Sequence, residues 1–255
     1  MRIITALKLL VKYYYRIIPT YLLAAIIILI AGQILPVIGA VLVLPVSIGV
    51  AYVMVFEVAS IKKREFFPIL IGFKKGKYQR NLGYLFLRQI VQYLPLGIGL
   101  ILDQLNIGPV SGIKIDLYFM VIGYNFFIFA IPSALLSLLF SMVPYILADP
   151  QYIPKRGNPL KISALLLRGN YLRLISIRLV FLPFILWAAS GLIISLTSFY
   201  SSLFGNNYIN PNIVTSWLFS APILFMFITP WYQMSHAVLY GEIRYKLKDL
   251  MVVNH

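Results

Sequence analysis

Side chains that can do acid–base, nucleophilic or metal chemistry are scarce in this sequence and are not grouped. His236 stands alone in an apolar stretch, where we expect a structural or interfacial role, and His255 is the last residue. A catalytic metal site needs several protein ligands, and two catalytic carboxylates must lie close together. Asp103 and Asp116 instead fall near the ends of apolar stretches, as solvated residues would. With no phosphate-binding loop or nucleophile elbow either, we expect no enzyme, no metal ion and no cofactor.

Polar residues inside apolar stretches are the other candidates, because charge within a membrane is costly and often functional. These intramembrane polar residues are Glu57, Arg88, Gln92 and Arg178. Three interpretations are open. Both arginines follow the start of their stretches closely, so each can extend its guanidinium to the cytosolic interface. Arg88 can instead pair with Glu57, or the group can line a path for a ligand or an ion.

A short motif of basic and aromatic residues recurs just before apolar stretches. It reads RGNYLRL at 168–174 and KGKYQRN at 75–81, with a looser copy, KYYYR, at 12–16. A chain that turns from the interface into the bilayer exposes helix-end carbonyls where water is scarce. Glycine permits such an elbow, tyrosine favours the headgroup level, and arginine can bind carbonyls or lipid phosphate. The expected elbow residues are Gly76, Tyr78, Arg80, Gly169, Tyr171 and Arg173.

The elements that must position these residues are transmembrane helices. Of the 255 residues, 61% are hydrophobic and 11% are charged, whereas a soluble domain has about 45–50% apolar and about 25% charged residues. Crossing a bilayer takes about 20 mostly apolar residues. The six predicted spans are Ile17–Leu35, Val37–Ala59, Leu82–Leu105, Leu117–Leu147, Leu174–Leu196 and Ser216–Ile243. The fourth is overlong and contains Pro132 and Pro144, so we expect it to be tilted, kinked or extended into the cytosol.

The basic residues orient these spans. Of the 22 lysines and arginines, Lys114 is the one on the opposite side from the rest, and Arg88 and Arg178 lie within spans. The positive-inside rule therefore places both termini in the cytoplasm. The net charge of +15 is explained by this topology and by attraction to anionic phospholipids. We therefore expect no nucleic-acid partner. The absence of cysteine excludes disulfides and thiolate metal sites.

Each pair of spans follows a short amphipathic segment that we expect to lie in the cytosolic interface. The clearest one begins at Asn158, a capping residue followed by Pro159, and ends at Gly169. In the first segment Ile3, Leu7, Leu10 and Val11 form the expected apolar stripe. The chain is therefore predicted to be one all-α membrane domain of three hairpins, with repeat-like units at about 1–59, 60–147 and 148–255.

Residues 145–187 resemble the signature region of the bacterial integral membrane family catalogued as domain of unknown function 975. In that pattern a span ends in aspartate, a serine-containing amphipathic helix ends in Gly-Asn or Gly-Lys, and the next span has a Phe-to-Trp stretch. The matching residues are Asp149, Ser163, Gly169, Asn170, Phe181 and Trp187. Leu167 departs from the pattern, which usually has methionine there. The resemblance implies an integral membrane protein, chiefly of low-GC Gram-positive bacteria, and carries no settled activity.

These features predict a non-catalytic, multi-pass plasma-membrane protein. We expect it to bind lipid or an apolar peptide and to work with a transport, export or bacteriocin-immunity-type system, so its partners would be anionic phospholipids and a hydrophobic peptide or a transporter. The alternative is an autonomous small-solute transporter or channel. Such proteins usually carry a denser set of ionisable groups or broken helices at the midplane, whereas the polar residues here cluster near one interface.

The predicted topology can be tested by cysteine labelling, because the native chain has no cysteine to give background. Cysteines placed at Lys74, Arg156 and Lys246 should be shielded from an impermeant thiol reagent in intact cells, and one at Asn207 should be labelled. Permeabilised cells provide the control, since all four sites should then react. Labelling of the Lys74 or Arg156 site from outside would contradict the six-span topology.

Overall fold

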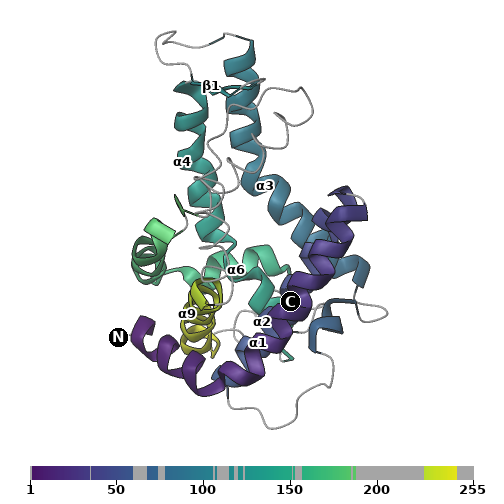
Figure 1. The fold of residues 1–255 in the computed structure, drawn as a ribbon. Helices are drawn as coiled ribbons and strands as arrows, with labels where there is room; N and C mark the ends of the chain where they lie inside the picture. The colour runs from purple at the N-terminus through teal and green to yellow at the C-terminus, as the bar shows by residue number, and fades with distance from the viewer. Residues whose placement is uncertain are drawn as a thin grey trace. The chain divides into compact units, whose positions relative to one another are not determined.

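The protein, described by a computed structural model, is built from α-helices, as the sequence predicts (Figure 1). The structure describes residues 2–34, 36–59, 68–73, 78–105, 107, 115–117, 120–122, 124–150, 152, 157–184, 186–187 and 227–245. The α-helices there are α1 (Arg2–Ile34), α2 (Pro36–Val58), α3 (Tyr78–Gln104), α4 (Tyr124–Leu139), α5 (Val143–Ala148), α6 (Pro159–Leu167) and α9 (Thr229–Ile243). A 3-10 helix η1 (Pro68–Phe73) and strands β1 (Ile115–Leu117) and β2 (Met120–Ile122) complete the named elements. Residues 171–184 are also helical.

Two helical stretches are long and apolar enough to cross a membrane. They are Tyr78–Gln104, which is α3, and Phe127–Ala148, which covers most of α4 together with α5. Helix α2 lies within one residue of the predicted second span at both ends. Parts of the predicted fifth and sixth spans, residues 188–196 and 216–226, lie outside the described residues.

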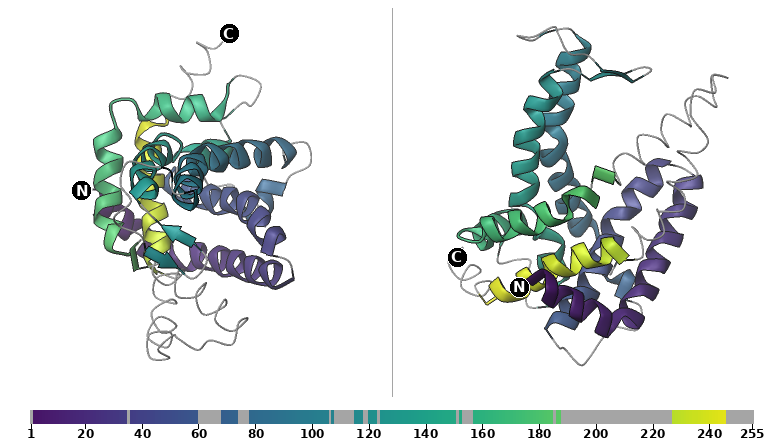
Figure 2. Two further views of the ribbon diagram at one scale, coloured as in Figure 1. Left: turned by 90° about the horizontal axis from the view of Figure 1, so that it is seen from above. Right: turned by 60° about the vertical axis from the view of Figure 1, so that its left-hand side comes forward.

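The chain divides into two compact units. The first comprises residues 1–88, 138–178 and 226–255, and the second comprises residues 89–137 and 179–225. In the first unit α1 packs against α2 and α9, and α2 also contacts η1, α5 and α9 (Figure 2). The core of this unit includes Leu10, Ile48, Met54, Ile146 and Tyr240, whose side chains are almost completely buried.

Helix α1 begins with the segment that the sequence predicts to be interfacial. Its helical geometry is interrupted at Tyr13 (φ −112°, ψ 16°), inside the looser copy of the repeated motif. Within the predicted apolar stripe Leu10 is buried in the protein, as is the neighbouring Ala6, whereas Val11 is 61% exposed. The buried face contacts α9, and the indole Nε1 of Trp231 donates to the carbonyl oxygen of Ile3 (3.0 Å).

Of the predicted second interfacial helix, the described residues show only the short 3-10 helix η1. This element packs closely against α2. A Cβ added to Gly72 of η1 would collide with the carbonyl oxygen of Pro45. Glycine is therefore required here for close backbone approach.

The fourth predicted span is broken at residues 140–142, which agrees with the kink, one of the three alternatives that the sequence left open. Pro144 has no N–H to continue the helix, and residues 140–142 form a turn between α4 and α5. In that turn the N–H groups of Ser141 and Val143 donate to the carbonyls of Leu138 (3.2 Å) and Phe140 (3.3 Å), three residues back. The change from the usual i−4 spacing frees the Leu139 carbonyl and the Met142 N–H from their helical partners.

Helix α6 supplies the partner for both freed groups. The Ser163 hydroxyl donates to the Leu139 carbonyl (2.7 Å) and accepts from the Met142 N–H (3.3 Å), and Ser163 is fully buried. The predicted start of α6 is confirmed, because Asn158 caps it by accepting from the Leu160 N–H (2.9 Å). A buried backbone group without a partner is costly, so Ser163 stabilises the helix break.

The end of α5 is joined to the end of α9 by a buried carboxylate. Asp149 accepts two hydrogen bonds from Arg244, through Nε (2.6 Å) and Nη2 (2.8 Å), and a third from the Tyr240 hydroxyl (2.9 Å). The Asp149 side chain is 0% exposed and that of Arg244 is 15% exposed. Burying a charged carboxylate costs free energy because it loses its water. The two hydrogen bonds from Arg244 and the third from Tyr240 offset this cost for Asp149.

In the second unit the later part of α3 lies beside α4 (Figures 1 and 2). The Ser133 hydroxyl donates to the carbonyl oxygen of Gln92 (2.6 Å). Asp103 is buried and accepts from the side chain of Asn125 (2.9 Å), so the expectation that Asp103 is a solvated span end is wrong.

The predicted helical start of the fourth span at Leu117 is also wrong. Strands β1 and β2 form an antiparallel hairpin there, with Asp116 opposite Val121. Ile115, Val121 and Ile122 are β-branched residues, which favour strands, and an apolar run this short does not distinguish strand from helix by periodicity.

Removing one partner of the Asp149–Arg244 pair should lower stability strongly. Arg244→Gln leaves a buried carboxylate without its cation, and we expect a loss of roughly 3–5 kcal/mol. Asp149→Asn should cost less, because the partly exposed guanidinium can be hydrated, and the two losses should be less than additive. The measurement is the melting temperature and the denaturant midpoint in detergent.

The matched control for this pair is Glu242→Gln, an exposed carboxylate of the same helix, which should change stability by about 0–1 kcal/mol. Additive losses at Asp149 and Arg244, or losses no larger than that of the control, would show that the pair does not hold α5 to α9.

Candidate functional site: a cationic pocket

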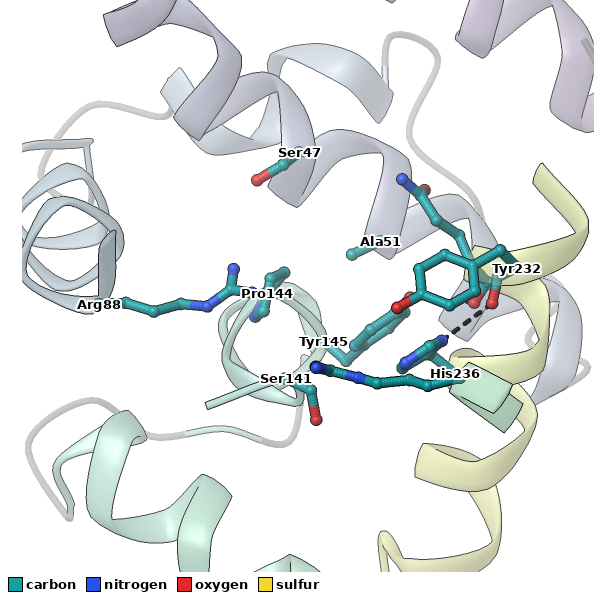
Figure 3. A pocket seen from close by; sticks show the side chains of 10 residues that line it. Ser47, Ala51, Arg88, Ser141, Pro144, Tyr145, Tyr232 and His236 are labelled. Atoms are coloured by element: carbon teal, nitrogen blue, oxygen red, sulfur yellow. Dashed lines mark hydrogen bonds between the residues drawn. The ribbon is translucent and has the colours of Figure 1, made fainter. Parts of the chain in front are cut away.

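A partly open pocket of about 180 Å³ lies within the first unit (Figure 3). It is formed where α2, the start of α3, the α4–α5 turn with α5, the helical residues 171–184 and α9 come together. Its lining residues are Ser47, Ala51, Arg88, Ser141, Pro144, Tyr145, Arg178, Tyr232, Gln233 and His236. The pocket thus brings together two of the intramembrane polar residues singled out in the sequence, Arg88 and Arg178.

Hydrogen bonds fix the wall that α9 contributes. The Tyr145 hydroxyl donates to the carbonyl oxygen of Gln233 (2.9 Å), and the side chain of Gln233 accepts a hydrogen bond from the Tyr21 hydroxyl. His236 Nδ1 lies 2.9 Å from the carbonyl oxygen of Tyr232, so Nδ1 carries the proton in this contact. The rings of Tyr232 and His236 pack edge to face, with their centroids 4.4 Å apart. His236 is therefore held in the pocket wall, where it is buried, and its expected structural role stays a prediction.

The pocket is electropositive. Figure 3 shows Arg88 extending into it from the side opposite Tyr232 and His236. Arg88 and Arg178 bring positive charge to the pocket, and no aspartate or glutamate is present among the lining residues that the structure describes. Guanidinium groups bind phosphate and carboxylate with two parallel hydrogen bonds. The arrangement therefore suits an anion.

Glu57 and Gln92, the remaining intramembrane polar residues, are not among the lining residues. Glu57 Oε2 lies 4.0 Å from Arg16 Nη1, and the side chain of Arg16 is 50% exposed. The pairing of Glu57 with Arg88 stays a prediction. Gln92 belongs to the second unit, where its backbone carbonyl oxygen accepts a hydrogen bond from the Ser133 hydroxyl.

The elbow at 168–174 has the geometry that its sequence suggests. Helix α6 ends at Leu167 with Arg168 as its C-cap, and Gly169 follows with φ +83°. The carbonyl oxygen of Ala164 accepts the Tyr171 hydroxyl (3.2 Å), whereas Arg173 Nη1 donates to the side chain of Asn170 (3.0 Å). In this structure tyrosine, rather than arginine, therefore bonds the helix-end carbonyl.

The second elbow is described only in part, because Gly76 lies outside the described residues. Tyr78 begins α3, and its ring stacks on Phe73 of η1 with centroids 5.6 Å apart. The positive charge of Arg80 reaches Tyr152, whose pKa is raised to about 12 by burial in spite of that charge. The Tyr152 hydroxyl therefore stays protonated and donates to the Gly157 carbonyl (2.8 Å).

Sequence reasoning missed several residues of the pocket, among them Ser141, Tyr145, Tyr232 and Gln233. Two signals were available. Pro144 marks the helix break that brings Ser141 and Tyr145 to the pocket, and Tyr232 and His236 are four residues apart, on one face of a helix. Their convergence on Arg88 and Arg178 depends on the packing of distant segments, which no local pattern encodes.

The positive φ of Gly169 predicts a graded response to substitution. A Cβ at this position meets no atom within 4 Å, so the cost comes from backbone strain and not from collision. Gly169→Ala should lower stability by about 1–2 kcal/mol and Gly169→Val by more, because a β-branched residue tolerates this conformation least. Gly169→Asn should be the mildest change. Melting temperatures in detergent would rank the variants.

Gly83→Ala is the matched control for this series, since Gly83 is exposed inside α3 and a Cβ there also meets no atom within 4 Å. That change should stabilise the protein by roughly 0.5–1 kcal/mol. If Gly169→Val melts like the wild type, the left-handed elbow is not needed for the fold.

Comparison of the chain with protein-family models, with curated proteins and with solved structures found no match. The assignment of residues 145–187 to the family of domain of unknown function 975 stays a prediction, and the function is inferred from the geometry of the pocket.

Proposed function

We propose that this chain is a non-catalytic, multi-pass plasma-membrane protein that binds anionic lipid in the pocket of Arg88 and Arg178. In this proposal the chain crosses the membrane six times, both termini are cytoplasmic, and the protein works with a transport, export or bacteriocin-immunity-type system. The observation that carries the proposal is the meeting of two guanidiniums at one pocket in a largely apolar chain. Lipid headgroups supply anionic phosphate at the membrane interface, where this proposal puts the pocket.

The exposed apolar surface of the second unit supports a membrane environment. Large apolar side chains are exposed along the described parts of α3 and α4 in this unit, namely Ile90, Leu94, Ile98, Ile101, Phe127, Ile131 and Leu135. Soluble monomers rarely expose contiguous apolar patches of more than a few hundred Å². Hydrocarbon chains of lipid would cover this surface in the proposed setting.

The exposed charges of the first unit support the proposed interface. Lys161 and Arg168 are exposed on α6 and its C-cap, while Leu160, Ile162 and Leu166 of the same helix are buried. A helix with one buried apolar face and exposed basic residues can lie in the headgroup region. The proposed partners are therefore anionic phospholipids first, and a hydrophobic peptide or a transporter protein second.

A second candidate function is an autonomous small-solute transporter. The observation that favours it is the broken helix beside the pocket, because transporters often build binding sites from discontinuous helices. Uptake of a small anion into proteoliposomes that contain only this chain would distinguish the two functions. The lipid-binding proposal expects no uptake above that of protein-free vesicles.

The lipid proposal predicts that anionic lipid stabilises the purified protein through the pocket. Phosphatidylglycerol at about 100 times its Kd should stabilise the protein by about 2.7 kcal/mol, or roughly 5–10 °C in melting temperature. Phosphatidylcholine should have little effect. Arg88→Gln and Arg178→Gln should each reduce the shift, and Lys161→Gln, an exposed basic residue outside the pocket lining, should leave it nearly unchanged.

Native mass spectrometry of the same samples would count the lipids that remain bound. Equal stabilisation by both lipids, or an undiminished shift in the Arg88 and Arg178 variants, would contradict anionic lipid binding at this pocket.

A further inference from the structure

One polar group of the pocket is not explained by the packing of the helices. The side chain of Ser141 lies in the α4–α5 turn, and the residue is only 6% exposed. Its Oγ is buried and has no hydrogen-bond partner among the residues that the structure describes. Buried hydroxyls without a partner are uncommon in native proteins. Ser163, packed at the same turn, uses its hydroxyl both as donor and as acceptor.

The backbone around Ser141 is already satisfied by the fold. The Ser141 N–H donates to Leu138, and the groups freed by the helix break bind Ser163. The hydroxyl alone therefore remains available, at a residue that lines the pocket together with Arg88 and Arg178. Water can satisfy a hydroxyl, but it carries no charge, and two guanidiniums at one pocket favour an anion.

The volume of the pocket limits the size of the group that can lie inside it. Sites for drug-sized ligands have volumes of about 300–1,000 Å³, whereas this pocket has about 180 Å³. A small terminal group fits such a space. A phosphate that carries a further glycerol or choline group would have to leave that group outside.

Two other hydroxyls of the described lining have acceptors within the protein. Ser47 donates to the carbonyl oxygen of Leu44 (2.6 Å) and Tyr145 donates to that of Gln233. The Ser141 hydroxyl is assigned to the ligand as a donor, and the guanidiniums of Arg88 and Arg178 are assigned for their positive charge and their several N–H donors. A phosphate monoester offers three terminal acceptor oxygens and a charge of about −1.5 to −2 at pH 7. A phosphate diester offers two free oxygens and a single charge.

We infer that the pocket binds a terminal phosphate group, with the Ser141 hydroxyl and the guanidiniums of Arg88 and Arg178 as donors. The inference rests on the proposed function, and it narrows the anionic ligand from phospholipids in general to those whose phosphate is unsubstituted. Free phosphate shares this chemistry, so lipid-borne and free phosphate are the two sources of ligand to be compared.

The test uses the full-length, delipidated protein in detergent. Binding of phosphatidic acid, phosphatidylglycerol and phosphatidylcholine is measured by titration of the melting temperature, and inorganic phosphate is titrated separately. The wild type should bind phosphatidic acid at least tenfold more tightly than phosphatidylglycerol. Ser141→Ala should remove most of this preference.

A purely structural serine would not give that result. Because the Ser141 hydroxyl has no partner within the described structure, Ser141→Ala should leave the melting temperature without ligand unchanged or slightly raised. Ser176→Ala is the matched control, since Ser176 is exposed on the helix that carries Arg178 and its hydroxyl bonds the Leu172 carbonyl. That variant should keep the wild-type preference.

The outcomes separate the two proposals. Tighter binding of phosphatidic acid that depends on Ser141 supports a lipid-borne terminal phosphate, and Ser141-dependent binding of inorganic phosphate without phosphatidic acid supports the free anion. Equal affinity for phosphatidic acid and phosphatidylglycerol, or a preference that persists in Ser141→Ala, overturns the inference while leaving anionic lipid binding intact. If neither anionic lipid binds better than phosphatidylcholine, the proposed function fails as well.

Discussion

The break between α4 and α5 is the constraint on which the rest of the described first unit depends. Pro144 prevents the helix from continuing, and in an apolar environment the freed backbone groups need new partners. One hydroxyl, that of Ser163, provides partners for both the Leu139 carbonyl and the Met142 N–H. The same two hydrogen bonds hold α6 against the turn between α4 and α5. The position of α6 therefore depends on the break in the helix that precedes it in the chain.

Two consequences follow from where the break falls. It lets α5 begin at Val143 and end at Ala148, so that Asp149 can reach Arg244 and Tyr240 of the α9 region. It also turns Ser141 and Tyr145 toward the pocket that α9 closes with Tyr232 and His236. The structural contact and the candidate site are built by different residues, but both depend on where α5 begins.

The sequence predicted those features whose cause is local. Asn158 and Pro159 start α6 and Gly169 follows its end, because capping and a positive φ depend on the residues themselves. Pro144 marked the kink for the same reason. The hairpin at β1 and β2 was missed, since a short apolar run with β-branched residues is compatible with either a strand or a span. The burial of Asp103 was also missed, because its partner Asn125 is 22 residues away in sequence.

The arginines show why the site itself was harder to predict than the fold. Arg88, Arg173, Arg178 and Arg244 all lie close to the ends of apolar stretches, and composition alone does not separate them. Arg244 is matched to a buried carboxylate with two hydrogen bonds, and Arg173 bonds an asparagine within its own elbow. Both contacts give the arginine a structural role.

Arg88 and Arg178 differ from Arg173 and Arg244 because both line the candidate pocket. They line one small pocket that contains a buried hydroxyl and, among the described lining residues, no acidic residue. In the proposed function a bound anion would contact both guanidiniums. The turn between α4 and α5 places Ser141 at the same pocket, which connects the packing around the helix break to the proposed site.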